Sequence, residues 1–451
     1  MSTPLDSKIF GPLFGDSEIN ELLTDEAYVR ALVEVETALA RAEGRLGVIP
    51  TSAAEQISKR AHWNKIDIAA LAKGTVRSGF PTLALVQELR KAVGKEAASY
   101  VHWGATTQDI MDTACVLQLR AVIKFYKARV SELARHLSEL SNRHRFTVLA
   151  ARTHGQQALP VSFGLKVAGW LAPLLRHAQR LDEISPRLMV VQFGGAAGTL
   201  AALGDKGLAV MHELADELEL GVPVMPWHSQ RDNLAEFAGW LSLLTGSLGK
   251  MAQDIILLAQ TEVGEVSESA EEGRGGSSTM PQKSNPITSE MIVTAARTNA
   301  SLLSALHQAQ IQEHERATHG WQVEWLTLPQ MIMLTGGALK HALYLAKNLQ
   351  ADPAKMRRNI AQGNDVILAE AAVFALAQAM PRSQADELVK KACAVAVREG
   401  KSLIQVIKNL TLGIIADDAI DWRALAAPEN YLGESERIID RVLKSAGDLM
   451  P

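Results

Sequence analysis

The middle of the chain consists of helical stretches that are unusually long for an ordinary globular domain. Apolar residues recur there every three to four positions over roughly 25–35 residues, which is the spacing of a helix with buried faces. Helices in globular proteins average about 11–12 residues, so these segments are expected to form an extended bundle of the kind often shared between subunits. Alternating strand patterns are nearly absent, and the fold class expected is all-α. The predicted long helices cover residues 112–144, 161–184, 230–268, 287–311 and 325–349.

Polar segments interrupt these helices. Residues 273–286 read GRGGSSTMPQKSNP, and their two prolines exclude a continuous helix. Residues 101–113 (VHWGATTQDIMDT), 151–160 (ARTHGQQALP) and 192–204 are further breaks. Because separated loops can meet at the ends of bundle helices, these segments are candidates for one shared pocket.

Charge and cysteine content exclude several classes of function. The 451-residue chain has a net charge of −4, so no overall basic field exists to hold nucleic acid or an anionic membrane. Its two cysteines, Cys115 and Cys393, form no metal set and no disulfide framework, and each is expected to be a buried small apolar side chain. The N-terminus has no secretory pattern, and no uncharged apolar run reaches the roughly 18 residues of a membrane span. We therefore expect a cytoplasmic protein.

Two motifs resemble cofactor or metal sites but lack the required context. GGAAG (194–198) has neither the preceding strand nor the spacing of a dinucleotide fingerprint, so a tight turn between helices is favoured. In HERATH (314–319), the two histidines are five positions apart and do not share a helical face. We expect no metal and no cofactor.

Three polar clusters have chemistry that fits a small polycarboxylate. Together they supply hydroxyl donors, two imidazoles and a cation, which suits proton transfer next to a carboxylate. Each cluster alone is a weak signal, because a single loop histidine is more often a hydrogen-bonded surface residue. The clusters are His102 with Thr106 and Thr107; Thr153 with His154; and Ser277, Ser278, Lys283 and Asn285.

GGSSTMPQKSNP (275–286) strongly resembles the signature loop of the fumarase/aspartase superfamily. GATTQDIMDTA (104–114), ARTHGQ (151–156), GGAAGT (194–199) and QRDNLAEF (230–237) resemble other superfamily motifs in the same order. The resemblance implies a three-domain fold with a long central helix bundle, in a homotetramer whose active sites are shared between subunits. The implied domains are residues 1–111, residues 112–355 with the signature loop 273–286, and residues 356–451.

The resemblance also implies roles for single residues. Ser277 matches the catalytic serine, which needs backbone amides and the cation of Lys283 to stabilise its alkoxide. His154 matches a second acid/base residue, and Asn285 a carboxylate ligand. The remaining substrate contacts implied are His102, Thr106, Thr107, Thr153 and Ser278.

Three features depart from the adenylosuccinate lyase branch. Residues 77–86 (RSGFPTLALV) lack a histidine that this branch carries, and Ser284 replaces an arginine of the signature loop. Trp325 stands where an arginine would grip a nucleotide phosphate, so a pocket with Trp321 and Trp325 suits a nucleotide poorly. SGFPTLAL and HERATHGWQVEW instead resemble the bacterial 3-carboxy-cis,cis-muconate cycloisomerases.

That branch implies an intramolecular lactonisation in protocatechuate breakdown. A carboxylate of the substrate adds to an alkene, and a proton is delivered next to another carboxylate. Arg231, Lys283 and Arg316 are candidates to offset the charge of the tricarboxylate substrate. Two alternatives stay open: a fumarate-releasing lyase like adenylosuccinate lyase, and a non-catalytic structural protein on a lyase scaffold.

Overall fold

The computed structural model describes residues 3–268, 275–276, 279–416 and 418–449 of the chain. It folds into two compact units, which are described separately. The three-domain division that the resemblance implies stays a prediction. Unit 1 comprises Met1–Val130, His177–Gly246 and Thr294–Lys340, and unit 2 comprises Ser131–Arg176, Ser247–Val293 and His341–Pro451.

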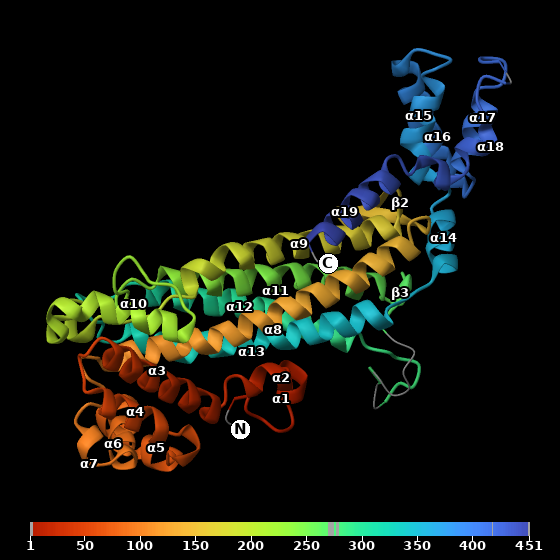
Figure 1. Ribbon diagram of the computed structural model, residues 1–451. Helices are drawn as coiled ribbons and strands as arrows, with labels where there is room; N and C mark the ends of the chain where they lie inside the picture. The colour runs from red at the N-terminus through yellow and green to blue at the C-terminus, as the bar shows by residue number, and fades with distance from the viewer. Residues whose placement is uncertain (1–2, 269–274, 277–278, 417, 450–451) are drawn as a thin grey trace. The chain divides into compact units, whose positions relative to one another are not determined.

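The long helices expected from the apolar spacing are present, and the all-α fold class is confirmed (Figure 1). They contain between 23 and 37 residues each. Such lengths are stabilised by packing of apolar faces more than by intrinsic helix propensity. The long helices are α8 (Thr107–Arg143), α9 (Phe163–Leu188), α11 (Asp232–Leu258), α12 (Ile287–Ala309) and α13 (Gly320–Asn348).

Unit 1 adds short helices to its parts of the long ones. The Thr24 side chain accepts a hydrogen bond from the backbone N–H of Ala27 and caps α3, as the sequence predicts. In the core, Trp240 stacks on Phe237 and contacts Tyr126, whose hydroxyl donates to a backbone carbonyl. The short helices are α1 (Gly11–Phe14), α2 (Ser17–Glu21), α3 (Asp25–Arg45), α4 (Thr51–Arg60), η1 (Trp63–Lys65), α5 (Ile68–Ser78), α6 (Thr82–Val93), α7 (Lys95–Ala98), η2 (Gly195–Ala197), η3 (Ala201–Lys206) and α10 (Gly207–Leu218).

Unit 2 combines its parts of the long helices with a hairpin and a group of short helices. A buried apolar cluster that includes Ile360, Leu376, Leu403 and Ile407 joins the short helices. The strands are β1 (Val148–Thr153), β2 (Gln156–Ser162), β3 (Val266–Ser267) and β4 (Gln350–Ala351), paired β1 with β2 and β3 with β4, both antiparallel. The helices are α14 (Pro353–Gln362), η4 (Val366–Leu368), α15 (Ala369–Leu376), α16 (Arg382–Glu399), α17 (Leu403–Leu410), α18 (Trp422–Leu425), η5 (Pro428–Tyr431) and α19 (Ser435–Leu449).

Two local predictions were wrong. Residues 148–162 form the β1–β2 hairpin rather than an irregular break, because two residues with positive φ at its tip close a two-residue turn. Helix α11 ends at Leu258 instead of continuing to 268, and a turn containing Gly264 (φ 56°) follows it.

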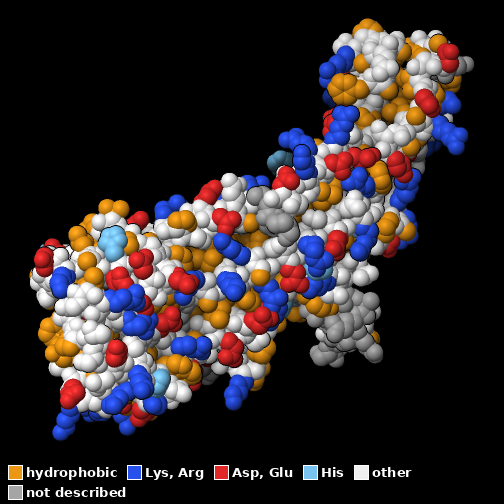
Figure 2. All heavy atoms as spheres, viewed as in Figure 1, with side chains coloured by type: hydrophobic (Ala, Val, Ile, Leu, Met, Phe, Trp, Pro, Cys, Tyr) orange, Lys and Arg blue, Asp and Glu red, His pale blue; other side chains and the backbone are white. Residues whose placement is uncertain are grey.

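The surface agrees with the small net charge. On the face shown in Figure 2, basic and acidic side chains are interspersed, and neither sign forms a large separate region. Among the described residues, no helix combines enough length with enough apolar character to cross a lipid bilayer.

Candidate active site

A buried carboxylate, Asp109 in the first turn of α8, organises the polar segments of unit 1. Asp109 is 1% exposed and accepts hydrogen bonds from the backbone N–H groups of Gly194 and Gly195, both at 2.9 Å. It also accepts from the backbone N–H of Thr106 at 3.0 Å and lies 2.7 Å from Nε2 of His228. A Cβ atom at Gly194 would lie 2.9 Å from the His228 ring, so this position requires glycine. The glycine turn therefore supplies two backbone hydrogen-bond donors to Asp109.

Several residues expected to bind substrate belong to unit 1. Arg316 donates a hydrogen bond from Nη1 to Oγ1 of Thr106 at 2.9 Å, and Thr107 is half-buried at the start of α8. Nδ1 of His102 lies 2.7 Å from Oε1 of Glu36. Burial acts to lower the pKa of His102, but the charge of Glu36 and the hydrogen bond to it outweigh burial, so the pKa is raised. This region thus holds hydroxyl and cationic groups with defined partners.

Arg231 has no free charge to offer a substrate. It is 2% exposed, and its guanidinium pairs with Asp112 at 2.6 and 2.9 Å and with Glu324 at 2.9 and 2.6 Å. Burial acts to lower the pKa of Arg231, but the two carboxylates outweigh it and raise the pKa above its ordinary value. Because two anions already balance this cation, the geometry does not favour the expectation that Arg231 offsets substrate charge.

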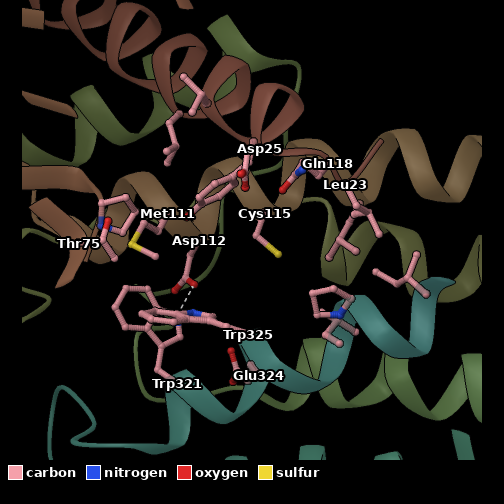
Figure 3. A pocket seen from close by; sticks show the side chains of 18 of the residues that line it. Leu23, Asp25, Thr75, Met111, Asp112, Cys115, Gln118, Trp321, Glu324 and Trp325 are labelled. Atoms are coloured by element: carbon pink, nitrogen blue, oxygen red, sulfur yellow. Dashed lines mark hydrogen bonds between the residues drawn. The ribbon is translucent and has the colours of Figure 1, made fainter. Parts of the chain in front are cut away.

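A largely apolar cavity of about 490 Å³ lies beside this ion cluster (Figure 3). Trp321 and Trp325 of α13 form part of its wall, and Nε1 of Trp321 donates to Asp112 at 3.0 Å. Among the described residues that line it, the carboxylates of Asp25, Asp112 and Glu324 outnumber the guanidinium of the ion cluster. A polycarboxylate would be repelled, so this cavity is not a suitable site for one.

Thr153 and His154 lie in unit 2, at the tip of the β1–β2 hairpin. Thr153 pairs with Gln156, and the two residues between them, His154 (φ 50°) and Gly155 (φ 78°), both have positive φ. This is the two-residue turn that matches the twist of paired strands. His154 is exposed in the single chain. Its imidazole is therefore accessible to another group.

The described part of the signature loop also lies in unit 2. The backbone N–H of Asn285 donates to the carbonyl of Gly275 at 2.8 Å, and Gly275 has a φ of 71°. A Cβ atom at Gly275 would lie 2.4 Å from the carbonyl oxygen of Asn285, so the close approach requires glycine. Lys283 is exposed and Asn285 is half-buried. Ser277 and Ser278 lie outside the described residues.

Two buried carboxylates fix the chain around the hairpin and the loop. Glu265 forms a bidentate ion pair with Arg152, with both N–O distances at 2.8 Å. Glu268 accepts hydrogen bonds from the backbone N–H groups of Thr288 and Ser289, at 3.0 and 2.7 Å, in the first turn of α12. Arg152 directly precedes the hairpin tip. Charge-assisted hydrogen bonds thus hold both segments of unit 2 in place.

Family comparisons agree with the motifs. Residues 14–298, which are more than half of the chain, match the family described as "Lyase". Residues 365–442 match the family described as "Adenylosuccinate lyase C-terminus". The chain belongs to the fumarase/aspartase superfamily of lyases. The superfamily indicated by the signature motifs is thus confirmed.

Individual members of the superfamily are similar over their full length. A 3-carboxy-cis,cis-muconate cycloisomerase from Bradyrhizobium diazoefficiens is 43% identical over 450 residues, which are 99% of each chain. The crystal structure of 3-carboxy-cis,cis-muconate lactonizing enzyme from Pseudomonas putida has a TM-score of 0.92 and 40% identity, covering 99% of this chain and 100% of that one. The crystal structure of a fumarate lyase from Mesorhizobium sp. BNC1 has a TM-score of 0.89 and 41% identity, covering 96% and 98%.

Two carboxylates that support the candidate site were not expected from the sequence. Asp109 and Glu36, which hold the segments of Thr106 and His102, were not singled out. A signal for Glu36 exists, because it lies on the apolar face of α3 together with Leu32 and Leu39. A carboxylate on such a face needs a partner. No comparable signal in the sequence identifies His228 as the partner of Asp109.

Proposed function

We propose that the chain is a 3-carboxy-cis,cis-muconate cycloisomerase, which forms 4-carboxymuconolactone in protocatechuate breakdown. The observation that carries the proposal is the identity of about 40% over the whole chain to a protein of this name and to a solved 3-carboxy-cis,cis-muconate lactonizing enzyme. The signature motifs of the superfamily are intact in this sequence.

The proposed reaction is balanced within one substrate molecule. A carboxylate oxygen adds to the β carbon of the conjugated alkene and forms the C–O bond of the lactone. The alkene electron pair moves toward the carbon next to another carboxylate, and a proton is delivered to that carbon. Because nucleophile and alkene belong to one molecule, the effective molarity of the carboxylate is high. No oxidant, reductant or co-reactant is consumed.

The proposed roles follow the chemistry of each group. Ser277 delivers the proton, and His154 orients the cyclising carboxylate or balances its charge. Lys283 and Arg316 offset the negative charge of the substrate, and the contact of Arg316 with Thr106 supports a location beside a hydroxyl donor. The further contacts proposed are His102, Thr107, Thr153, Ser278 and Asn285.

We further propose a homotetramer whose active sites combine residues from several subunits. Large apolar side chains on long helices are exposed in the single chain: Leu243 (55%) and Leu257 (48%) of α11, and Leu326 (71%) of α13. Large apolar side chains that are exposed on otherwise buried helices favour contact with other copies of the chain. We also propose the three-domain division of the superfamily for this chain.

The competing function is a lyase that releases fumarate, and the similarity to the Mesorhizobium fumarate lyase favours considering it. One assay separates the two functions. The purified protein is given 3-carboxy-cis,cis-muconate or adenylosuccinate; loss of the diene absorbance and release of fumarate are then followed, with lactone identified by mass. We expect lactone only. Fumarate release would replace the proposal with the lyase, and inertness toward both substrates would favour a non-catalytic protein.

A further inference from the structure

Helix α3 carries two buried carboxylates that the proposed mechanism does not use. Glu36 and Glu43 are 2% and 0% exposed and lie about two helical turns apart, on the same side of the helix. Three of their four carboxylate oxygens have no hydrogen-bond partner among the described residues: Oε2 of Glu36 and both oxygens of Glu43. Buried carboxylates without partners are costly, so their protonation states need an explanation.

The two carboxylates differ in what faces them. Glu36 has the imidazole of His102, with Nδ1 at 2.7 Å from Oε1. Glu43 has no cation paired with it among the described residues, and burial together with the charge of Glu36 raises the pKa of Glu43 to about 9. A neutral acid at Glu43 therefore fits its surroundings at pH 7, whereas Glu36 is the carboxylate that contacts a ring able to carry positive charge.

His102 is held with one ring edge toward Glu36 and the other edge available. Its side chain is 17% exposed, and no described residue forms a hydrogen bond with Nε2. Besides Glu36, the charged groups that act on the imidazole are Asp109, which favours the protonated ring, and Arg90, which opposes it. His102 directly precedes the segment of Thr106, whose hydroxyl contacts Arg316.

We propose that Glu36 is a positioning residue that keeps His102 as an imidazolium whose Nε2–H binds a substrate carboxylate, with Glu43 as a neutral carboxylic acid behind it. The inference rests on the proposed function, because it needs a polycarboxylate substrate. The imidazolium of His102 would supply a positive charge that Arg231 does not offer, because Asp112 and Glu324 balance the charge of Arg231. His102 therefore carries a positive charge only while its ring is protonated.

The test uses the full-length protein and four variants. Glu36→Gln removes the charge but keeps an amide of the same shape, and Glu36→Asp restores a carboxylate. Glu43→Gln is the matched control, because an amide closely resembles a neutral acid. The pKa of His102 is measured without substrate by NMR of 13C-histidine-labelled protein, with the resonance assigned from His102→Gln. KM and kcat are measured against pH, and thermal melting checks that each variant is folded.

We expect Glu36→Gln to lower the pKa of His102 and to reduce kcat/KM by about 10- to 100-fold at pH 7.5, mainly through KM. In the wild type, KM should rise as pH increases through the raised pKa of His102, and in Glu36→Gln this rise should begin at lower pH. Glu36→Asp should recover part of both effects. Glu43→Gln should leave the pKa of His102 unchanged and KM within about twofold of the wild-type value.

Two results would overturn the inference. One is a His102 pKa that is the same in Glu36→Gln and the wild type, and the other is a loss confined to kcat. If Glu43→Gln acted as strongly as Glu36→Gln, Glu43 would be ionised, and the assignment of a neutral acid would be wrong. The NMR titration needs no turnover, so it decides the protonation of His102 even if the protein fails to lactonise 3-carboxy-cis,cis-muconate.

Discussion

The polar groups of unit 1 and those of unit 2 are built differently. In unit 1, Asp109 and Arg231 are almost fully buried, and each satisfies several partners at once. In unit 2, His154 and Lys283, for which acid/base and cationic roles are proposed, are exposed in the single chain. The supporting carboxylates of unit 2, Glu265 and Glu268, are buried, but they bind backbone or neighbouring side chains rather than these groups.

This difference separates the residues that maintain shape from those proposed to react. A buried, fully paired network contributes to stability and to the position of a loop, and losing one member leaves others unpaired. An exposed imidazole at a hairpin tip contributes little to folding stability, so it can take part in a reaction without being needed for the fold. Substitution of Asp109 and substitution of the exposed groups of His154 or Lys283 should therefore change different measured quantities.

The largest effect is expected in the signature loop. Ser277→Ala should lower kcat by about 10²- to 10⁴-fold, because the proposed proton donor is lost, while the melting temperature stays unchanged. Turnover of the diene substrate and thermal melting are the measurements. Activity within about tenfold of the wild type would remove Ser277 from the mechanism, and Ser278→Ala would then be the variant to test.

A second large effect is expected from mixing inactive variants. If Ser277 and His154 of one site come from different subunits, then Ser277→Ala and His154→Ala proteins should regain activity after subunit exchange. At equal amounts, about a quarter of the sites would receive both intact residues by random mixing. Exchange is confirmed by native mass spectrometry. Fully exchanged mixtures without activity at any ratio would place both residues of a site on one chain.

The hydrogen-bond network of Asp109 in unit 1 should respond through stability. Asp109→Ala leaves the N–H groups of Gly194 and Gly195 and the His228 ring without their acceptor, which should cost about 3–5 kcal/mol of folding free energy. The expected readout is a large fall in melting temperature. Asp109→Asn, which keeps one acceptor oxygen, should lose less. A melting temperature equal to that of the wild type in Asp109→Ala would contradict the supporting role of this carboxylate.

The smallest effect is expected at the hairpin tip. Gly155 has a φ of 78°, and a Cβ atom at this position would point into open space, so Gly155→Ala should cost only the backbone strain of about 1–2 kcal/mol. Gly155→Asn should cost less, because asparagine tolerates this conformation. Thermal melting ranks the three proteins. Equal stability of the alanine and asparagine variants would show that the turn relaxes to another geometry.

Much of the fold could be read from local patterns. The apolar spacing of residues 112–144 predicts α8, and Thr24 predicts the start of α3, because both signals depend on neighbours along the chain. The β1–β2 hairpin was missed because His154–Gly155 is a less familiar form of a positive-φ turn than Asn–Gly. The sequence signal for this turn was Gly155 directly after His154, a residue type that can adopt positive φ.

By itself, the sequence determined the helical class, the superfamily motifs and the residues that carry reactive groups, because each of these is written in composition or in local order. Only the tertiary structure decided how the charges are shared. It pairs Arg231 with Asp112 and Glu324, and His102 with Glu36. The partners of Arg231 in the chain are 119 and 93 positions away, and that of His102 is 66 positions away. The strength of a charge at a site depends on burial and on the nearest opposite charge, and both are set by packing between segments that are distant along the chain.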